Sequence, residues 1–185
     1  MEIQKFDIEG LLLIKPKVFG DERGYFFESF NKKFFEEVVG EAVNFIQDNE
    51  SKSSYGVLRG LHFQRPPFTQ AKLVRVIEGK VLDIAVDLRA DSPTYGQHKA
   101  VVLSSENKHQ FFVPRGFAHG FLVLSEIATF AYKVDNDYAP TYDDGIAYNS
   151  EILEIDWMID EKDIQFSEKD KQLQTFAHYS KSPIL

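Results

Sequence analysis

The stretch GVLRGLHFQRPPFTQAKLVRVIEGKV, residues 56–81, reads as two apolar strands that carry three basic groups. Val, Leu, Ile and Phe dominate both halves, as is typical of strands. Arg59, His62 and Lys72 nevertheless stand among residues that are normally buried. A cation on a strand usually lies on a solvent-exposed face, so burial of these three side chains would need a specific function.

In a regular strand, the side chains of Arg59 and His62 would point to opposite faces. Side chains alternate between the two faces of a regular strand, and these two residues lie three positions apart. Gly60, which follows Arg59, is a candidate for a bulge that redirects one of them. Periodicity leaves open whether both side chains enter the same cavity.

The sequence around this stretch predicts an all-β fold. Short runs rich in Val, Phe and Leu recur between Gly, Pro, Asn and Asp residues, at the spacing typical of sandwiches and barrels. We expect a jelly-roll β-barrel of the cupin kind, with a few short peripheral helices. The predicted strands fall within residues 44–53, 56–64, 72–89, 98–104, 109–125 and 128–140, after two short strands in 11–30 joined by the loop GDERG.

Three local features refine this prediction. Residues 31–39 are expected to be helical, capped by Asn31 and ended by Gly40. The segment VIEGKVLDIAVDL is expected to be a hairpin with its turn at Glu78–Gly79. The polar tail, residues 158–179, is expected to hold one or two short helices packed on the outside of the barrel.

Composition limits the class of protein. With 185 residues, 43% of them hydrophobic, we expect a single domain spanning residues 1–185. The absence of cysteine excludes disulfides and thiolate metal sites, and the net charge of −8 argues against nucleic acid as a partner. The apolar run near the N-terminus is too short for a signal peptide or a membrane span, so a cytoplasmic protein is expected.

The motif that supplies metal ligands in cupins is only partly present here, because two of its ligand positions hold other residues. Its first half runs from Gly56 through His62 to Gly79, but Gln64 stands at the second histidine position and Lys72 at the glutamate position. The second half is intact as Pro114, Gly116 and His119. An ammonium repels a cation, so no metal site is expected. A cavity that replaces Glu by Lys and adds Arg59 suits an anion instead.

The chain resembles the dTDP-4-dehydrorhamnose 3,5-epimerase family, also called the RmlC family. Seven collinear segments carry the resemblance: PKVFGDERGYFFESF (16–30), FIQDNESKSSYGVLRGLHFQ (45–64), KLVRVIEGKVLDIAVDLR (72–89), SPTYG (92–96), FFVPRGFAHGFLVLS (111–125), YKVDNDYAP (132–140) and FSEKD (166–170). Enzymes of this family invert C3 and C5 of a 4-keto-6-deoxy sugar attached to dTDP, and they use no cofactor.

The resemblance implies a role for each of four residues in proton transfer. His62 corresponds to the base and Asp170 to the carboxylate that orients it. Lys72 would stabilise the enolate oxygen at C4. Tyr132 would return a proton from the opposite face, as inversion requires.

The resemblance also implies how the substrate is bound. Arg23, Arg59 and Lys169 would hold the diphosphate, because guanidinium and ammonium groups suit phosphate. His119 would line the site near the ketone and diphosphate. Arg23 and Glu28 would come from the partner subunit of a homodimer that exchanges strands. The residues implied at the nucleotide end are Glu28, Gln47, Asn49 and Asp143, where Asp143 stands in place of the family's usual glutamate, and Tyr138 would stack near the thymine or the sugar.

Three other functions remain open at this stage. An epimerase that inverts only C3 would use the same His, Lys and Asp. A metal-dependent cupin oxygenase would need ligands that Gln64 and Lys72 do not supply. A sugar-binding module without catalysis would be expected to lack His62 or Asp170, and both are present.

Overall fold

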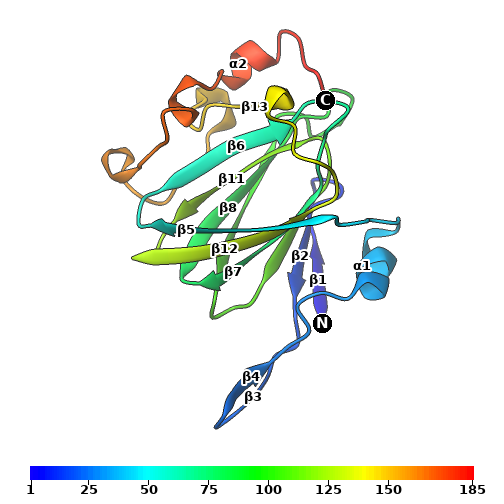
Figure 1. Cartoon of the computed structure of the whole chain (residues 1–185). Helices are drawn as coiled ribbons and strands as arrows, with labels where there is room; N and C mark the ends of the chain where they lie inside the picture. The colour runs from blue at the N-terminus through cyan, green and yellow to red at the C-terminus, as the bar shows by residue number, and fades with distance from the viewer.

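The computed structural model describes residues 1–185 and has two antiparallel sheets packed face to face (Figure 1). One sheet has the order β1-β2-β10-β7-β12-β5, and the other has the order β13-β6-β11-β8-β9. The jelly-roll prediction is confirmed. The strands of the first sheet are β1 (Glu2–Lys5), β2 (Leu12–Lys15), β10 (Gln110–Val113), β7 (Lys72–Glu78), β12 (Ile127–Val134) and β5 (Gln47–Ser54). Those of the second are β13 (Asp143–Gly145), β6 (Leu58–Gln64), β11 (Phe117–Val123), β8 (Lys80–Asp87) and β9 (His98–Ser104).

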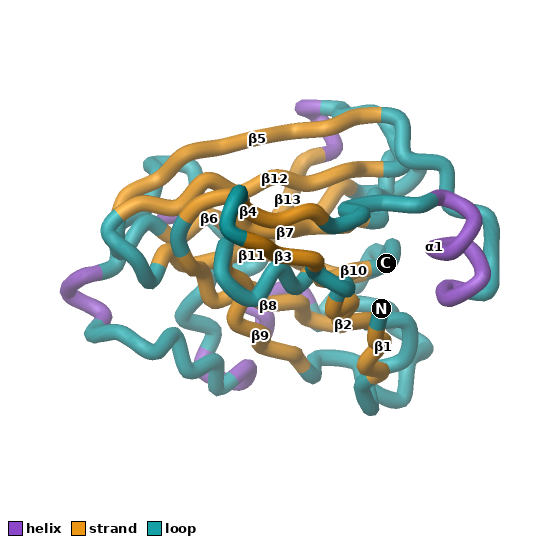
Figure 2. The backbone as a smooth tube through the Cα atoms, turned by 90° about the horizontal axis from the view of Figure 1, so that it is seen from below, coloured by secondary structure: helices purple, strands orange, loops and turns teal.

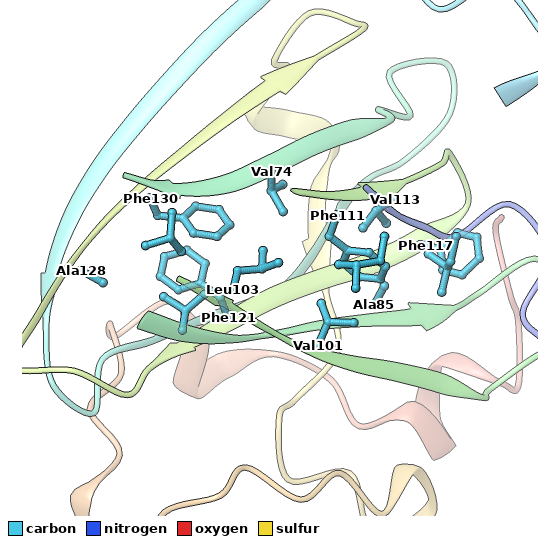
Figure 3. Packing of buried hydrophobic residues seen from close by; sticks show 14 of the residues in the cluster. Val74, Ala85, Val101, Leu103, Phe111, Val113, Phe117, Phe121, Ala128 and Phe130 are labelled. Carbon is cyan, nitrogen blue, oxygen red and sulfur yellow. The ribbon is translucent and has the colours of Figure 1, made fainter. Parts of the chain in front are cut away.

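The main core lies between the two sheets. Alternate side chains of both sheets point inward and form a cluster of 16 buried residues, with Phe111 and Phe130 among its largest fully buried members (Figure 3). Phe121 stacks on Phe130 with ring centroids 4.1 Å apart. Burial of aromatic rings at this density fixes how the two sheets pack, and so positions the inward polar side chains described below.

Short helices cover the outer faces of both sheets. Helix α1 (Lys32–Val39) is capped by the Asn31 side chain, which accepts a hydrogen bond from Phe34 N at 3.2 Å, and it ends at Gly40 in the left-handed conformation, as predicted. Its Phe35 packs on the first sheet. The tail covers the second sheet with the helix α2 (Phe176–Tyr179) and the 3-10 helices η2 (Glu151–Leu153), η3 (Glu161–Asp163) and η4 (Asp170–Gln172) (Figure 1). The prediction of short helices outside the barrel is confirmed.

The predicted hairpin at Glu78–Gly79 is wrong. Strands β7 and β8 flank this turn, but β7 pairs with β10 and β12 in one sheet while β8 pairs with β9 and β11 in the other. Gly79 does adopt a positive φ of 79°, and an added Cβ would lie 2.0 Å from the Ile127 carbonyl oxygen. The turn therefore carries the chain from one sheet to the other, and the pattern of apolar residues is the same for both arrangements.

A two-stranded arm extends away from the barrel. Strands β3 (Phe19–Asp21) and β4 (Gly24–Phe26) pair only with each other, and the loop between them is shorter than the predicted GDERG. The arm lies well apart from both sheets in Figure 1. It exposes apolar rings, and Phe26 is 70% exposed. At the other side of the first sheet, β5 forms an open edge (Figure 2).

No helix has the length and apolar character needed to cross a membrane.

Candidate active site

A cavity of about 530 Å³ opens between the two sheets at the end where the tail crosses the barrel. Lys72 and Tyr132 line it from the first sheet, and Arg59, His62 and His119 line it from the second. Asp170 reaches it from η4. The structure thus brings together all four residues predicted to transfer protons, from segments up to 108 residues apart.

A larger hollow of about 890 Å³ lies elsewhere, between the loops around residues 5–12 and 38–44. It contains no histidine or tyrosine, and its two arginines already form ion pairs. Arg115 pairs with Asp135 at 2.9 Å and Arg89 with Asp87 at 2.7 Å. The smaller cavity, in contrast, is lined by two histidines and a tyrosine as well as by Lys72 and Asp170.

A bulge in β6 explains how Arg59 and His62 reach the same cavity. They lie three residues apart, yet they oppose Phe121 and His119 of β11, which are only two apart, so β6 carries one extra residue here. Gly60 is part of the bulge, with a φ of 126°, and an added Cβ would lie 2.5 Å from the Gly120 Cα. The question left open by alternation is therefore settled: both side chains line the cavity.

His62 and Asp170 form a hydrogen-bonded pair. The Nε2 atom of His62 lies 2.6 Å from Oδ1 of Asp170, while the Ser167 hydroxyl donates to Oδ2 at 2.8 Å. Burial alone would raise the pKa of Asp170, but the hydrogen bonds from His62 and Ser167 outweigh burial and lower the pKa below its ordinary value. Asp170 is therefore a carboxylate at neutral pH that accepts the Nε2 proton, which leaves Nδ1 of His62 free to take up another.

Lys72 is enclosed by the cavity walls and keeps some contact with the cavity solvent. Burial lowers its pKa from 10.5 to about 8, while the negative charges of Asp143 and Asp83 partly oppose this shift. The side chain makes no hydrogen bond or ion pair within the chain. It therefore presents a weakly solvated ammonium group, which suits a charge that develops on a bound molecule.

Tyr132 faces the cavity from the sheet opposite to His62. Its ring packs near Phe130, with centroids 6.1 Å apart. Burial raises the pKa of its hydroxyl, with the positive charge of Arg59 acting in the opposite direction. The hydroxyl therefore retains its proton at neutral pH and can donate it.

The second buried pair joins His119 to Asp83. His119 Nε2 lies 2.8 Å from Asp83 Oδ1, and both side chains are buried. Asp83 was not among the predicted site residues. The sequence does indicate that Asp83 is unusual. It lies on the same face of β8 as the core residues Val81 and Ala85, where an acidic side chain is rare.

Of the remaining predicted residues, Arg59 and Lys169 line the cavity, and the others lie near its mouth or outside its lining. Arg59 donates to Ser53 Oγ at 3.2 Å, and Lys169 forms an ion pair with Asp143. Tyr138, 53% exposed, donates to Asp143 at 3.3 Å. The neighbouring Asp144 instead accepts a hydrogen bond from the Gln174 side chain at 3.3 Å. Of the two adjacent acids, Asp143 is therefore the one that contacts Lys169 and Tyr138 at the cavity mouth. Two pairs lie outside the cavity lining: Gln47 and Asn49, which bond to each other on β5, and Arg23 and Glu28, which belong to the arm and the segment after it.

The groups at the cupin motif positions do not form a metal-binding set. Gln64 donates to Asp143 at 3.1 Å and accepts from Ala139 N at 2.9 Å, so both ends of its amide are engaged. No group of three or more His, Asp and Glu side chains has the arrangement a metal ion needs. The cavity offers an ammonium, a base held by a carboxylate and a phenol, which together suit abstraction and return of a proton next to a carbonyl.

Fold and site define the class: a cupin-type jelly-roll barrel whose cavity is equipped for acid–base chemistry on an anionic substrate. A family model described as dTDP-4-dehydrorhamnose 3,5-epimerase matches residues 5–178. The dTDP-4-dehydrorhamnose 3,5-epimerase of Shigella flexneri is 52% identical over 177 residues, which cover 96% of this chain and 97% of that protein. The chain belongs to the dTDP-4-dehydrorhamnose 3,5-epimerase family.

Solved structures agree with this assignment. The crystal structure of dTDP-4-dehydrorhamnose 3,5-epimerase from Elizabethkingia anophelis superimposes with a TM-score of 0.92 at 52% identity, covering 96% of this chain and 97% of that one. The epimerase RmlC from Legionella pneumophila, solved in complex with dTDP-4-keto-L-rhamnose, has a TM-score of 0.90 at 50% identity, covering 94% and 92%.

Proposed function

We propose that this chain is an isomerase that inverts C3 and C5 of dTDP-4-keto-6-deoxy-D-glucose to give dTDP-4-dehydro-L-rhamnose, in the biosynthesis of dTDP-L-rhamnose. The observation that carries the proposal is the pairing of His62 with Asp170 on one wall of the cavity and Tyr132 on the opposite wall. Membership in the epimerase family and the structure of a relative bound to dTDP-4-keto-L-rhamnose support the substrate class.

His62 acts as the base. The C4 ketone acidifies the C–H bonds at both neighbouring carbons, so one base in reach of each carbon in turn is sufficient. Asp170 accepts the Nε2 proton of His62, which fixes the tautomer with a free Nδ1 and stabilises the imidazolium after abstraction. No cofactor is required for this step.

Lys72 stabilises the enolate. Removal of a proton from C3 or C5 moves negative charge to the C4 oxygen, and the ammonium of Lys72 supplies the compensating charge inside a cavity that excludes much of the water. This role explains why a lysine occupies the position where metal-binding cupins have a glutamate.

Tyr132 returns the proton. It lies on the sheet opposite to that of His62, and inversion requires that the proton leave from one face of the carbon and arrive on the other. Because burial keeps its hydroxyl protonated, Tyr132 can act as the acid at each carbon. Exchange with solvent then restores His62 and Tyr132 to their starting states.

The cations near the cavity bind the diphosphate. Arg59 lies within the cavity, and Lys169 lies at its mouth beside Asp143. His119 lines the cavity and contributes near the ketone and the diphosphate. Arginine grips phosphate oxygens through two parallel hydrogen bonds, which fixes the orientation of the sugar.

The protein acts as a homodimer in which the arms are exchanged. The side chain of Arg23 is 85% exposed at the tip of the arm, and the arm carries exposed apolar rings that a partner would cover. The open edge of β5 can accept further strand pairing. Arg23 would then reach the diphosphate in the partner's site, and Glu28 would join Gln47, Asn49 and Asp143 at its nucleotide end, with Tyr138 near the thymine or the sugar.

The test is conversion of dTDP-4-keto-6-deoxy-D-glucose by the purified protein with a chelator present, coupled to reduction of the 4-keto product. Formation of dTDP-L-rhamnose supports the proposal. A product inverted only at C3 would assign the protein to the single-epimerase branch of the family. Loss of all activity on chelation would instead favour a metal-dependent cupin.

A further inference from the structure

Gln64 is a buried polar residue that the proposed steps do not use. It stands at the position where a metal-binding cupin has its second histidine, and it is 4% exposed. A buried amide without partners would cost free energy, so the partners of this side chain indicate what it does.

Both ends of the Gln64 amide are bonded to the segment that forms the cavity mouth. Oε1 accepts from the backbone N–H of Ala139 at 2.9 Å, and Nε2 donates to Oδ1 of Asp143 at 3.1 Å. Because a backbone N–H can only donate, the carbonyl end of the amide must face Ala139 and the NH2 end must face Asp143. The side chain therefore holds this segment at two points.

The pairing of β13 with β6 explains why Gln64 reaches Asp143. The two residues lie directly opposite each other in this ladder. Since side chains alternate along a strand, both point to the same face as His62, which lines the cavity. The neighbouring Asp144 points to the other face, where it accepts from Gln174 at 3.3 Å.

Asp143 in turn contacts two groups proposed to bind the substrate. Its Oδ2 accepts from the hydroxyl of Tyr138 at 3.3 Å and forms an ion pair with Lys169. The side chain of Asp143 is mostly buried, whereas Tyr138 and Lys169 are exposed. An exposed side chain loses rotamer entropy when a ligand immobilises it, and a bond to a fixed partner reduces that cost.

The rest of the mouth segment is held independently of Gln64. Gln70 donates to the carbonyl oxygen of Asn136 at 2.8 Å, and Arg65 donates to the carbonyl oxygen of Thr141 at 2.6 Å. Removal of the Gln64 amide should therefore leave the segment folded and act locally, at the groups that the amide contacts.

We propose that Gln64 is a positioning residue for the nucleotide end of the site. Its amide fixes Asp143 and the backbone at Ala139. Asp143 in this position orients Tyr138 for the thymine or the sugar and Lys169 for the phosphates of a nucleoside diphosphate. The inference rests on the proposed function, and it explains why a glutamine occupies the histidine position of metal-binding cupins: the end that faces the acid is a donor.

The first test is binding of dTDP to the folded full-length protein, measured by titration calorimetry without turnover. Gln64→Met keeps the length of the side chain and removes both bonds, so Kd should rise about tenfold. Gln174→Met is the matched control, because it removes the corresponding bond to the adjacent Asp144, outside the cavity lining. It should change Kd by less than about twofold.

A folded Gln64→Met variant with wild-type affinity would overturn the inference, and so would an equal loss of affinity in Gln174→Met. A wild-type protein that does not bind dTDP would instead count against the proposed function.

Steady-state rates separate positioning from chemistry. In Gln64→Met, KM for dTDP-4-keto-6-deoxy-D-glucose should rise about tenfold while kcat stays within about threefold, because His62, Lys72 and Tyr132 keep their places. A fall in kcat with unchanged KM would contradict the inference, since it would assign Gln64 to the proton transfers.

Gln64→Glu gives a readout that a merely structural role would not move. Glutamate can still accept from Ala139, but its ionised carboxylate cannot donate to Asp143 and repels it. As the pH falls, the two facing acids should share a proton, so the ratio of the Kd for dTDP in this variant to that in wild type should fall at least about fivefold between about pH 7.5 and about pH 5.5. A ratio that is independent of pH would refute the donor role of Gln64.

The comparison with wild type at each pH cancels the titration of dTDP itself and of the other groups around this pair. Those facing it are His62, Lys72, Tyr132, Tyr138 and Lys169, with Arg65 and Asp144 at the neighbouring positions of the same two strands.

Tyr138→Phe tests the same contacts at an exposed residue, and it stands if the Gln64 variants do not fold. The ring remains available for stacking, while the hydroxyl that donates to Asp143 is lost. Kd for dTDP should rise about threefold. Unchanged affinity would show that Asp143 does not orient Tyr138 and would overturn the inference.

Discussion

Replacement of Lys72 by methionine should abolish catalysis and at the same time stabilise the fold. The ammonium is enclosed between the two sheets, and burial holds its pKa near 8 instead of 10.5. A difference of this size corresponds to roughly 3 kcal/mol against the folded state when the group is charged. Because Lys72 keeps some contact with cavity solvent, we expect a gain of about 1–3 kcal/mol in the free energy of unfolding of Lys72→Met at pH 7.

The gain should depend on pH in a defined way. Below pH 8, Lys72 is protonated in both the folded and the unfolded chain, so the free-energy cost of burying its charge does not change with pH. Between pH 8 and 10.5, the folded protein loses this proton while the unfolded chain keeps it, so wild-type stability rises with pH relative to the variant. The difference between the two proteins should therefore be largest below pH 8 and vanish near pH 10.5.

Urea unfolding followed by the fluorescence of Trp157, the single tryptophan, measures this difference. Both proteins are compared at one fixed concentration, because self-association of the kind proposed would add to apparent stability. Lys80→Met, on the exposed first position of β8, is the control for added hydrophobicity and should change stability by less than about 0.5 kcal/mol. A Lys72→Met variant that is less stable than wild type, or a gain that does not depend on pH, would refute the reasoning.

Three further predictions concern neighbouring residues. Tyr132→Phe should still exchange C3 and C5 protons with solvent but lose most net inversion, measured by product analysis; an unchanged rate of inversion would show that water or another group is the acid. Asp170→Asn should lower kcat by on the order of 10³-fold, because the amide lacks the charge that stabilises the imidazolium of His62 and its NH2 group can hold the opposite tautomer; an effect below about tenfold would remove Asp170 from this role. Gly60→Ala should lower the free energy of unfolding by more than about 2 kcal/mol in urea titrations, because a Cβ would meet the Gly120 backbone; unchanged stability would contradict the proposed close approach.

The architecture was predictable because its signals are local. Strand residues recur with turn residues between them, and the Asn31 cap and Gly40 stop are determined by a few neighbouring residues. The error at Gly79 has a physical reason. A glycine with positive φ serves equally well in a tight hairpin and in a corner between two sheets, and only the partners of β7 and β8 distinguish the two.

The candidate site could be predicted only in part from the sequence. Periodicity left the faces of Arg59 and His62 open, because a bulge depends on the opposite strand β11 as much as on Gly60 itself. His62 and Asp170 meet across 108 residues, and spacing carries no information about such a contact. Asp83 was missed although it alternates with the core residues Val81 and Ala85, because its partner His119 lies 36 residues away in the sequence. Only the three-dimensional structure shows that it is buried against His119.

The most direct test of the central claim, that His62 is the base for both inversions, is proton NMR of dTDP-4-keto-6-deoxy-D-glucose in deuterated water. Exchange is followed separately at C3 and C5 with wild-type protein and with His62→Ala, and binding of dTDP is measured for both. We predict deuterium at both carbons with wild type, and at neither with His62→Ala, while dTDP binding is largely retained. Exchange that persists at either carbon in the variant would contradict the assignment of His62 as the base.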